Sequence, residues 1–200
     1  CVATGYGRVS VPYADKMITE ITCHAMGAVW IFDNKDMTII DIGGQDTKII
    51  CVEQGFVKDF MMNDKCSAGT GRFLEIMANT LSMRPNEMCE LAREGSGVTI
   101  SSMCTVFAES EVISLIGQGE KKENIAFAVV DSIVRKVAAQ ANRMSEDRPM
   151  LCLTGGLCEC SYISEALTKE LGMEVKTDPQ SRYAGAIGAA LGAVKKGKKN

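Results

Sequence analysis

Residues 37–62 read MTIIDIGGQDTKIICVEQGFVKDFMM and carry the strongest indication of the fold. Its first part (37–42) is a short apolar run that leads straight into two glycines, which is typical of a strand. Two further strands are predicted at 46–52 and 56–62, with a Gln-Gly turn between them. The stretch therefore predicts a three-stranded meander.

Helices and further strands are predicted on both sides of the meander. Before it, the segment PYADKMITEITCHAMGA (12–28) opens with a proline and carries apolar residues at helical spacing, so we expect a helix that ends near Gly27. After it, helices are predicted at 69–81, 85–94, 105–117, 121–144, 161–171 and 182–196, and strands at 98–101, 150–153 and 173–176. This order predicts an α/β layered domain with a parallel section on its C-terminal side.

The composition narrows the classes of protein to consider. An apolar fraction of 46% and a charged fraction of 24% are those of an ordinary globular protein. The net charge of −3 gives no sign of a nucleic-acid-binding surface, and no apolar run approaches the ~18 residues of a membrane span. The chain opens at Cys1 without an initiator methionine, so we expect further residues to precede it.

The nine cysteines are odd in number and scattered through apolar stretches. This pattern argues against a secreted disulfide framework and favours reduced thiols or metal ligands in the cytoplasm. Only Cys158 and Cys160 are closely spaced, and no second pair completes a set of four ligands. Because His24 is the one histidine, a mixed cysteine–histidine zinc site is not expected either.

The first motif that suggests chemistry is DIGGQDTK, residues 41–48. An aspartate at a strand end followed by two glycines suits a phosphate and Mg²⁺ site. In such a site Asp41 would hold a metal-bound water, Gly43 and Gly44 would donate backbone N–H groups, and Gln45 would orient an attacking water. The alternative is a hairpin entry in which the glycines only relieve crowding.

Two cysteines each precede a predicted helix. Cys66 lies in NDKCSAGTGRFLE, where Gly69-Thr70-Gly71 should leave free N–H groups aimed at an anion or a cluster. Cys104 lies in SSMCTVFAESEVISL, with Ser102 or Thr105 as possible caps. Helix N-termini favour the thiolate, but an iron–sulfur cluster usually takes four thiolates, which a symmetric dimer would supply. The alternative for each is a lone cysteine that packs as a small apolar residue.

The last two motifs lie in the C-terminal third. In LCLTGGLCEC (151–160) an apolar strand ends in a Gly155-Gly156 turn that would let the backbone pass close to a flat adenosine group. The predicted helix YAGAIGAALGA (183–193) has small residues every three or four positions. Such a helix either packs closely against another backbone or acts as a hinge between two domains.

Taken together and in this order, DIGGQDTK, MNDKCSAGTGRFLE, CTVFAESEVISL, LTGG and the small-residue helix resemble the activator family of 2-hydroxyacyl-CoA dehydratases. That family also includes the ATPase subunits of benzoyl-CoA reductases. ATGYGR and ADKMITEITCHAMGA are similar to it too, so the resemblance covers nearly the whole chain. It departs at Cys160, where the family tends to have Asn, and at Arg182, where the nearest patterns have Gln.

The resemblance implies the actin-like fold of sugar kinases and heat-shock ATPases, which is ribonuclease H-like. Residues 1–36 would be the C-terminal remnant of the first lobe. Residues 37–200 would be a near-complete second lobe with the cluster ligands and the connecting helix. The first phosphate loop, Asp-x-Gly-Ser/Thr, has no counterpart in this sequence. We therefore expect weak ATP binding and little hydrolysis from these residues alone.

The resemblance also assigns roles to individual residues. The catalytic residues would be Asp41 and Gln45, and the cluster ligands Cys66 and Cys104. The nucleotide would be held by Gly43, Gly44, Asp46, Gly69, Thr70, Gly71, Gly155, Gly156 and Arg182.

The implied function is that of an ATPase that passes a low-potential electron to a dehydratase. The cofactors would be ATP/ADP, Mg²⁺ and one 4Fe-4S cluster per homodimer. The partners would be a dehydratase of the 2-hydroxyglutaryl-CoA type and an electron donor such as ferredoxin or flavodoxin, with neither nucleic acid nor membrane. The alternatives are an ATPase subunit of a benzoyl-CoA reductase-like enzyme and a non-hydrolysing iron–sulfur regulatory module.

Overall fold

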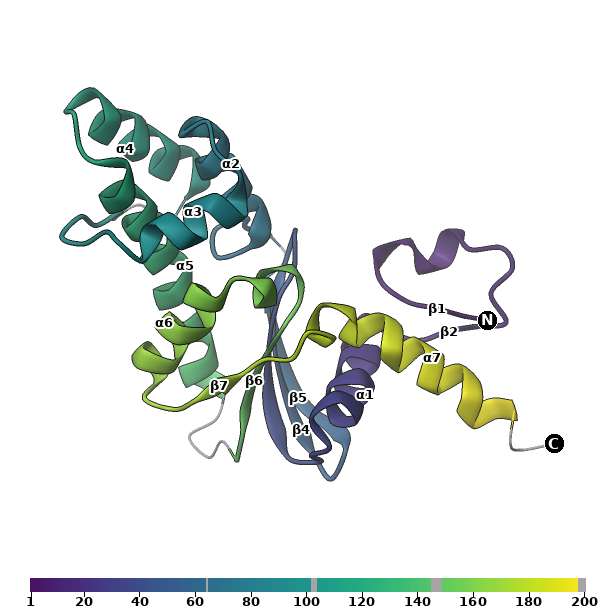
Figure 1. The fold of residues 1–200 in the computed structure, drawn as a ribbon. Coiled ribbons are helices and arrows are strands. Elements are labelled where there is room, and N and C mark those ends of the chain that lie inside the picture. Colours follow the sequence, from purple (N-terminus) through teal and green to yellow (C-terminus); the bar gives the residue numbers. More distant parts are fainter. Residues whose placement is uncertain (64, 102–103, 145–148, 198–200) are drawn as a thin grey trace.

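A computed structural model describes residues 1–63, 65–101, 104–144 and 149–197. Figure 1 shows a central sheet with helices against both faces, a helical group beyond the ends of its strands and an N-terminal arm on the side of the C-terminal helix. Among the described helices, none combines the length and the apolar character that crossing a membrane would need.

The five-stranded sheet has the order β5-β4-β3-β6-β7. β3 pairs antiparallel with β4 and β4 antiparallel with β5, whereas β6 and β7 extend the sheet as parallel strands. The strands are β3 (Met37–Ile42), β4 (Thr47–Glu53), β5 (Phe56–Asn63), β6 (Leu151–Thr154) and β7 (Val175–Lys176). The predicted meander and the predicted parallel section are both confirmed.

The central strand β3 explains why the sequence there is a continuous apolar run. All six of its residues are buried, because helices cover both faces of the sheet. Its register places Asp41 opposite Lys48 on one side and Thr154 on the other. Side chains from the two neighbouring strands, β4 and β6, therefore lie beside Asp41 at the end of the central strand.

The helices form two layers and a separate group (Figure 1). α5 (Lys122–Met144) and α6 (Ser161–Leu171) pack on one face of the sheet, where the larger apolar core lies. α1 (Glu20–Phe32) lies on the other face over a smaller core that includes Ile39 and Ile50, and α7 (Ala184–Gly197) packs against α1. The group beyond the sheet consists of α2 (Gly71–Thr80), α3 (Pro85–Ala92) and α4 (Thr105–Gly117).

α1 and α7 cross with their backbones in close contact. A Cβ added at Gly27 would lie 1.9 Å from the Ala184 carbonyl oxygen, and one at Gly188 would lie 1.8 Å from that of Cys23. The small residues of α7 therefore pack closely against the backbone of α1, which confirms the close packing predicted for residues 183–193. The hinge role stays a prediction, as does the division into 1–36 and 37–200. In the structure α1, which belongs to 1–36, packs against α7 and the sheet.

The helix predicted over 12–28 is wrong at both ends. α1 starts only at Glu20, because Thr19 caps it and accepts a hydrogen bond from Thr22 N–H. It runs past Gly27, whose missing side chain serves the contact with α7, and ends at Phe32. The residues before it form short elements instead: β1 (Val2–Ala3), the 3₁₀ turn η1 (Tyr6–Ser10) and β2 (Lys16–Met17).

The strand predicted over 98–101 is also wrong. These residues are irregular in the structure, although Ile100 is buried as an apolar strand residue would be. The Ser101 N–H donates to the Glu111 carboxylate of α4 at 2.8 Å instead of to a neighbouring strand. A side chain therefore satisfies the backbone group that a sheet would otherwise have used.

Candidate functional site

Asp41 lies buried at the end of β3 and is surrounded by hydrogen-bonding groups. His24 Nε2 is 3.2 Å from Oδ1, and Thr154 Oγ1 donates to the same oxygen at 3.2 Å. Lys48 Nζ is 3.3 Å from Oδ2. These partners come from α1, β6 and β4, so the carboxylate links three elements of the fold.

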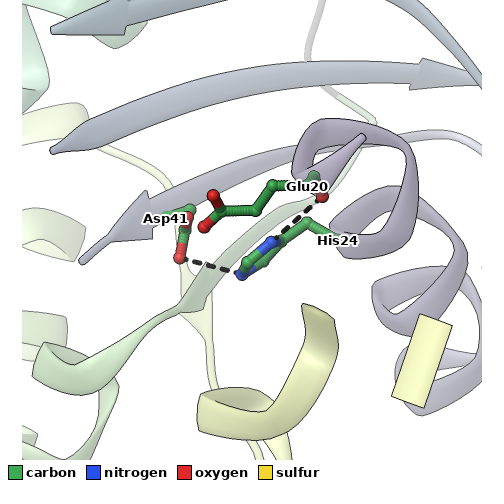
Figure 2. Close-up of side chains that lie close together, drawn as sticks. All are labelled: Glu20, His24 and Asp41. Atoms are coloured by element: carbon green, nitrogen blue, oxygen red, sulfur yellow. Dashed lines mark hydrogen bonds and ion pairs between the residues drawn. The ribbon is translucent and has the colours of Figure 1, made fainter. Parts of the chain in front are cut away.

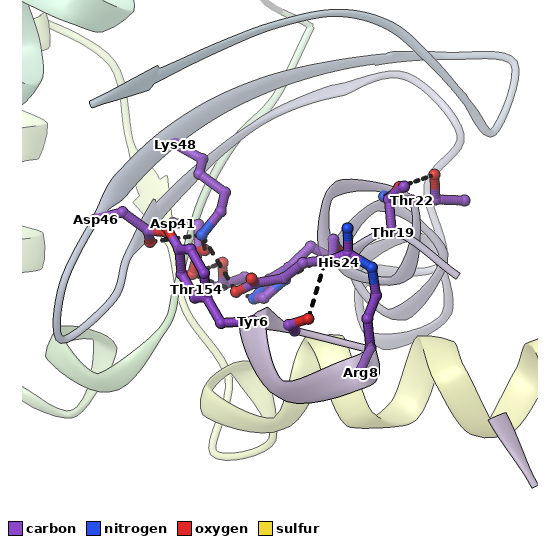
Figure 3. A network of polar contacts seen from close by, with 11 residues as sticks. Tyr6, Arg8, Thr19, Thr22, His24, Asp41, Asp46, Lys48 and Thr154 are labelled. Atoms are coloured by element: carbon purple, nitrogen blue, oxygen red, sulfur yellow. Dashed lines mark hydrogen bonds and ion pairs between the residues drawn. The ribbon is translucent and has the colours of Figure 1, made fainter. Parts of the chain in front are cut away.

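Lys48 connects Asp41 to the rest of a polar network (Figure 3). Its ammonium donates to Asp46 Oδ1 at 2.5 Å and to Glu20 Oε1 at 3.2 Å. The Tyr6 hydroxyl donates to the other oxygen of Asp46 at 2.7 Å, which ties the N-terminal arm to the site. One buried cation is thus shared by three carboxylates.

The pKa shifts show which charges this network favours. Burial alone would raise the pKa of Asp41, but the hydrogen bond and charge of His24 and those of Lys48 lower it. Burial alone would lower the pKa of His24, but the Asp41 carboxylate raises it. Burial likewise opposes the charge of Lys48, and its carboxylate partners raise the pKa above the ordinary value. Asp41 therefore stays ionised in a dry site.

Glu20, His24 and Asp41 also converge as a group with the donor atoms of a metal site (Figure 2). One donor atom of each lies within 4.8 Å of the others, and His24 Nδ1 contacts the Glu20 carbonyl oxygen at 3.3 Å. The ammonium of Lys48 already lies 3.2 to 3.3 Å from the two carboxylates. A cation centred on this group would have to compete with Lys48.

The glycine hairpin of the first motif docks on the helix that follows the first cysteine. The Gly71 N–H donates to the Gly43 carbonyl at 2.9 Å, and the Arg72 N–H donates to the Gly44 carbonyl at 2.8 Å. The Thr70 N–H donates to Ser67 O at 3.0 Å. The expectation of free amides at Gly69-Thr70-Gly71 is therefore wrong for Thr70 and Gly71.

Gly44 and Gln45 remain exposed and border an open cavity of about 490 Å³. Cys66 and Arg72 line the same cavity. The tip of the hairpin predicted to contact phosphate thus opens into the space that holds the first of the two candidate cluster ligands.

The Gly155-Gly156 turn follows β6 and passes beside Asp41. Gly155 has φ +81°, and a Cβ there would lie 2.4 Å from the Ile42 carbonyl oxygen and 2.6 Å from Asp41 Oδ1. Arg182, which was expected to contact the nucleotide, pairs with Glu159 at the end of the same turn. The phosphate and adenosine motifs therefore meet at the end of the central strands.

This close approach predicts that Gly155→Ala destabilises the fold by about 2–4 kcal/mol, because strain at positive φ adds to a clash with a backbone oxygen and a carboxylate oxygen. The matched control is Gly156→Ala, whose Cβ would meet no described atom within 4 Å. It should change stability by no more than about 0.5 kcal/mol. Urea unfolding measures both, and equal effects would contradict the packing described.

The loops of Cys66 and Cys104 are joined directly. Ser67 Oγ and Thr105 Oγ1, the residues after the two cysteines, are hydrogen-bonded at 2.7 Å. Cys66 is half-buried and Lys136 Nζ donates to its sulfur at 3.7 Å. Cys104 is exposed and is itself the N-cap residue of α4, so Thr105 is not the cap; Ser102 lies outside the described residues.

Sequence reasoning missed the partners of Asp41. Lys48 lies in the first motif, and its place in a tight hairpin could have indicated its contact with Asp41, because antiparallel pairing puts the two residues opposite one another. His24 was considered only as evidence against zinc, and Glu20, Tyr6 and Thr154 were not singled out. Those residues lie 17 to 113 positions from Asp41, Lys48 or Asp46, the residues that they contact, and no local pattern indicates such pairs.

Comparisons with known proteins find relatives over nearly the whole chain. The chain matches the model of the BadF/BadG/BcrA/BcrD ATPase family over residues 1–193. It is 48% identical to the (R)-2-hydroxyglutaryl-CoA dehydratase activating ATPase of Acidaminococcus fermentans, over 99% of this chain and 76% of that protein. The crystal structure of that dehydratase's component A gives a TM-score of 0.94, with the same identity and coverage.

Two further relatives are similar over most of this chain. The activator of the 2-hydroxyisocaproyl-CoA dehydratase from Clostridium difficile, solved with bound ADPNP, gives a TM-score of 0.93 at 40% identity, covering 99% of this chain and 74% of that one. A benzoyl-CoA reductase subunit of Thauera aromatica is 32% identical over 94% of this chain and 68% of its own length.

Proposed function

Because this chain belongs to the BadF/BadG/BcrA/BcrD ATPase family, we propose that it is the ATP-hydrolysing activator of a 2-hydroxyacyl-CoA dehydratase, of the 2-hydroxyglutaryl-CoA type, and that it passes one electron to that enzyme from a cysteine-bound 4Fe-4S cluster. Its fold is the actin-like ATPase fold that the sequence predicted. The chain is an ATPase of this family, and nucleotide binding follows from the likeness to the ADPNP-bound relative.

One observation carries the proposal. The cavity bordered by Gly44 and Gln45 is also lined by Cys66, and the Ser67–Thr105 hydrogen bond joins the Cys66 loop to the Cys104 loop. A change at the phosphate hairpin would therefore reach the Cys66 loop through this cavity and the Cys104 loop through the hydrogen bond. This contiguity would let ATP change the surroundings of an electron-transfer centre.

At the nucleotide, the residues of the first motif suit phosphate and Mg²⁺. Asp41 is held ionised, so it would bind a metal-bound water, and a bound Mg²⁺ would offset the phosphate charge. Gln45 is exposed at the hairpin tip and would orient the attacking water. The expectation that the Gly43 N–H contacts phosphate is wrong, because it donates to Asp46 O at 2.9 Å. The exposed Gly44 would let the phosphates approach the backbone, with Gly155 and Gly156 at the adenosine end and Asp46 fixing Lys48.

At the cysteines, the chain offers two thiolates of the four that a cluster usually takes. We assign these to Cys66 and Cys104, with a second copy of the chain supplying the other two. The start of α4 beside Cys104 supports this, because Val106 and Phe107 are 66% and 65% exposed there. Such an apolar surface suits a contact with another subunit. The Lys136 ammonium would offset part of the thiolate charge.

The cluster supplies one-electron chemistry when bound, so two protein partners follow. The dehydratase component receives the electron, and a donor of the ferredoxin or flavodoxin class replaces it. Of the alternatives, a subunit of a benzoyl-CoA reductase is favoured less, since identity to the Thauera aromatica protein is 32% against 48% for the activating ATPase.

The test is reconstitution of the complete protein with iron and sulfide under anaerobic conditions. We expect about four irons per two chains. With a reductant, MgATP and a 2-hydroxyglutaryl-CoA dehydratase, the mixture should form the unsaturated acyl-CoA, and ADP in place of ATP should not support it. Iron binding and ATP turnover without any activation of dehydratase would overturn the proposed role. A protein that binds the cluster but never hydrolyses ATP would instead be a regulatory module.

A further inference from the structure

Cys89 and Cys160 form a buried pair that the proposed function does not use. Cys89 lies on α3 and Cys160 is the N-cap residue of α6, and they are 1% and 5% exposed. Their thiols are hydrogen-bonded to one another. Two thiols brought together from positions far apart in the chain are already near the partner that each would need for a disulfide.

Contacts around the pair hold α3 against the start of α6. Arg93, one turn after Cys89, donates to Ser161 Oγ at 3.0 Å and forms an ion pair with Glu165. Its guanidinium lies 5.3 Å from the centre of the Tyr162 ring. Arg93 makes all of these contacts beside the cysteines, so this one side chain holds α3 against the start of α6.

The two sulfurs also differ in character. The hydrogen bond from Cys89 lowers the pKa of Cys160, helped by the backbone N–H groups at the start of α6. The same hydrogen bond, together with burial, raises the pKa of Cys89. The backbone N–H groups at the start of α6 favour the thiolate at Cys160, so we assign the first attack to this sulfur.

A metal site is not favoured at this pair. Among the described residues, the one group with three or more suitable ligands is Glu20, His24 and Asp41, which does not include either cysteine. A structural metal site needs about four ligands, and this place offers two.

We propose that Cys89 and Cys160 form a reversible disulfide on exposure to a peroxide, and that this bond switches off the nucleotide site. The Cys160 thiolate attacks one peroxide oxygen, the O–O bond breaks, and with one proton a water leaves and a sulfenic acid remains. The Cys89 thiol then attacks that sulfur, the S–S bond forms, the S–O bond breaks and a second water leaves. Two thiols and one hydrogen peroxide thus yield one disulfide and two waters.

The consequence for nucleotide follows from the place of Cys160 and rests on the proposed function. A disulfide holds its sulfurs at about 2.05 Å, closer than two thiols in non-bonded contact, so we expect the bond to draw the start of α6 toward α3. The Cys160 N–H donates to Leu157 O at 3.2 Å, and the Cys158 N–H donates to Gly155 O at 3.2 Å. The shift is therefore transmitted to the Gly155 turn, which lies against Asp41.

The test treats the complete protein with hydrogen peroxide, blocks free thiols and maps disulfides by mass spectrometry without reductant. We expect a peptide pair joined through Cys89 and Cys160, lighter by two hydrogens and released by dithiothreitol. Affinity for a fluorescent ADP analogue should fall at least fivefold on oxidation and return on reduction. The Cys66→Ser/Cys104→Ser double variant should show the same cross-link and the same fall in ADP affinity. That result would separate the effect of the disulfide from the loss of a cluster.

Cys89→Ala and Cys160→Ala should abolish both the cross-link and the loss of affinity, whereas Cys51→Ala should change neither. If both alanine variants fail to fold, the disulfide map of the unmodified chain still decides. An oxidised protein without this cross-link would overturn the modification site. A complete cross-link with unchanged ADP affinity would overturn the switch, and a dehydratase that is never activated would bear on the proposed function alone.

Discussion

Asp41→Asn should lower the kcat for ATP hydrolysis at least about 100-fold, the size of effect seen when one charge-stabilising group is lost from an active site. The substitution keeps the shape of the side chain but removes the charge that the network holds ionised. Lys48 keeps Asp46 and Glu20 as partners, so the fold should survive. The measurement is steady-state ATPase activity of the complete protein, with circular dichroism to verify folding.

The control for this variant is Asp59→Asn, which makes the same chemical change at an exposed position on β5. It should keep the kcat of the unmodified protein. The Asp41→Asn protein should also retain its iron while failing to activate the dehydratase, because the cysteine loops are untouched. An Asp41→Asn protein with half or more of the normal kcat would show that the carboxylate does not act in hydrolysis.

Cys66→Ser and Cys104→Ser should each reduce bound iron from about four per two chains to background. A serine hydroxyl has nearly the size of the thiol but does not ionise near neutral pH, so it is a poor ligand for iron. Iron and sulfide assays with electron paramagnetic resonance spectroscopy measure the loss. The subunits should also separate, since the cluster would bridge them.

Cys51→Ser and Cys89→Ser are the matched controls, because they change a half-buried and a buried thiol outside the two joined loops. Both should keep the full iron content. ADP binding should persist in all four variants, which distinguishes loss of a ligand from loss of the fold. Full iron in either Cys66→Ser or Cys104→Ser would mean that another cysteine is a ligand.

Much of the fold was predictable because its elements follow local patterns. The run MTIIDI is apolar almost throughout because both faces of β3 are covered. Apolar periodicity predicted α5 and α6 within one residue of their observed ends. The predictions over 12–28 and 98–101 were wrong for reasons outside those segments. The contact with α7 lets α1 continue through Gly27, and the Glu111 carboxylate takes the amide of Ser101.

Local sequence patterns identify the residues with chemistry to offer: Asp41 at a strand end, glycines beside it, and two cysteines that precede helices. The contacts of those residues come from the packing of distant elements. Lys48, His24 and Thr154 converge on Asp41 from three elements, and the Ser67–Thr105 hydrogen bond joins loops 38 residues apart. Strand and helix periods are set by neighbours along the chain, whereas these contacts depend on how the layers pack, which no local pattern encodes.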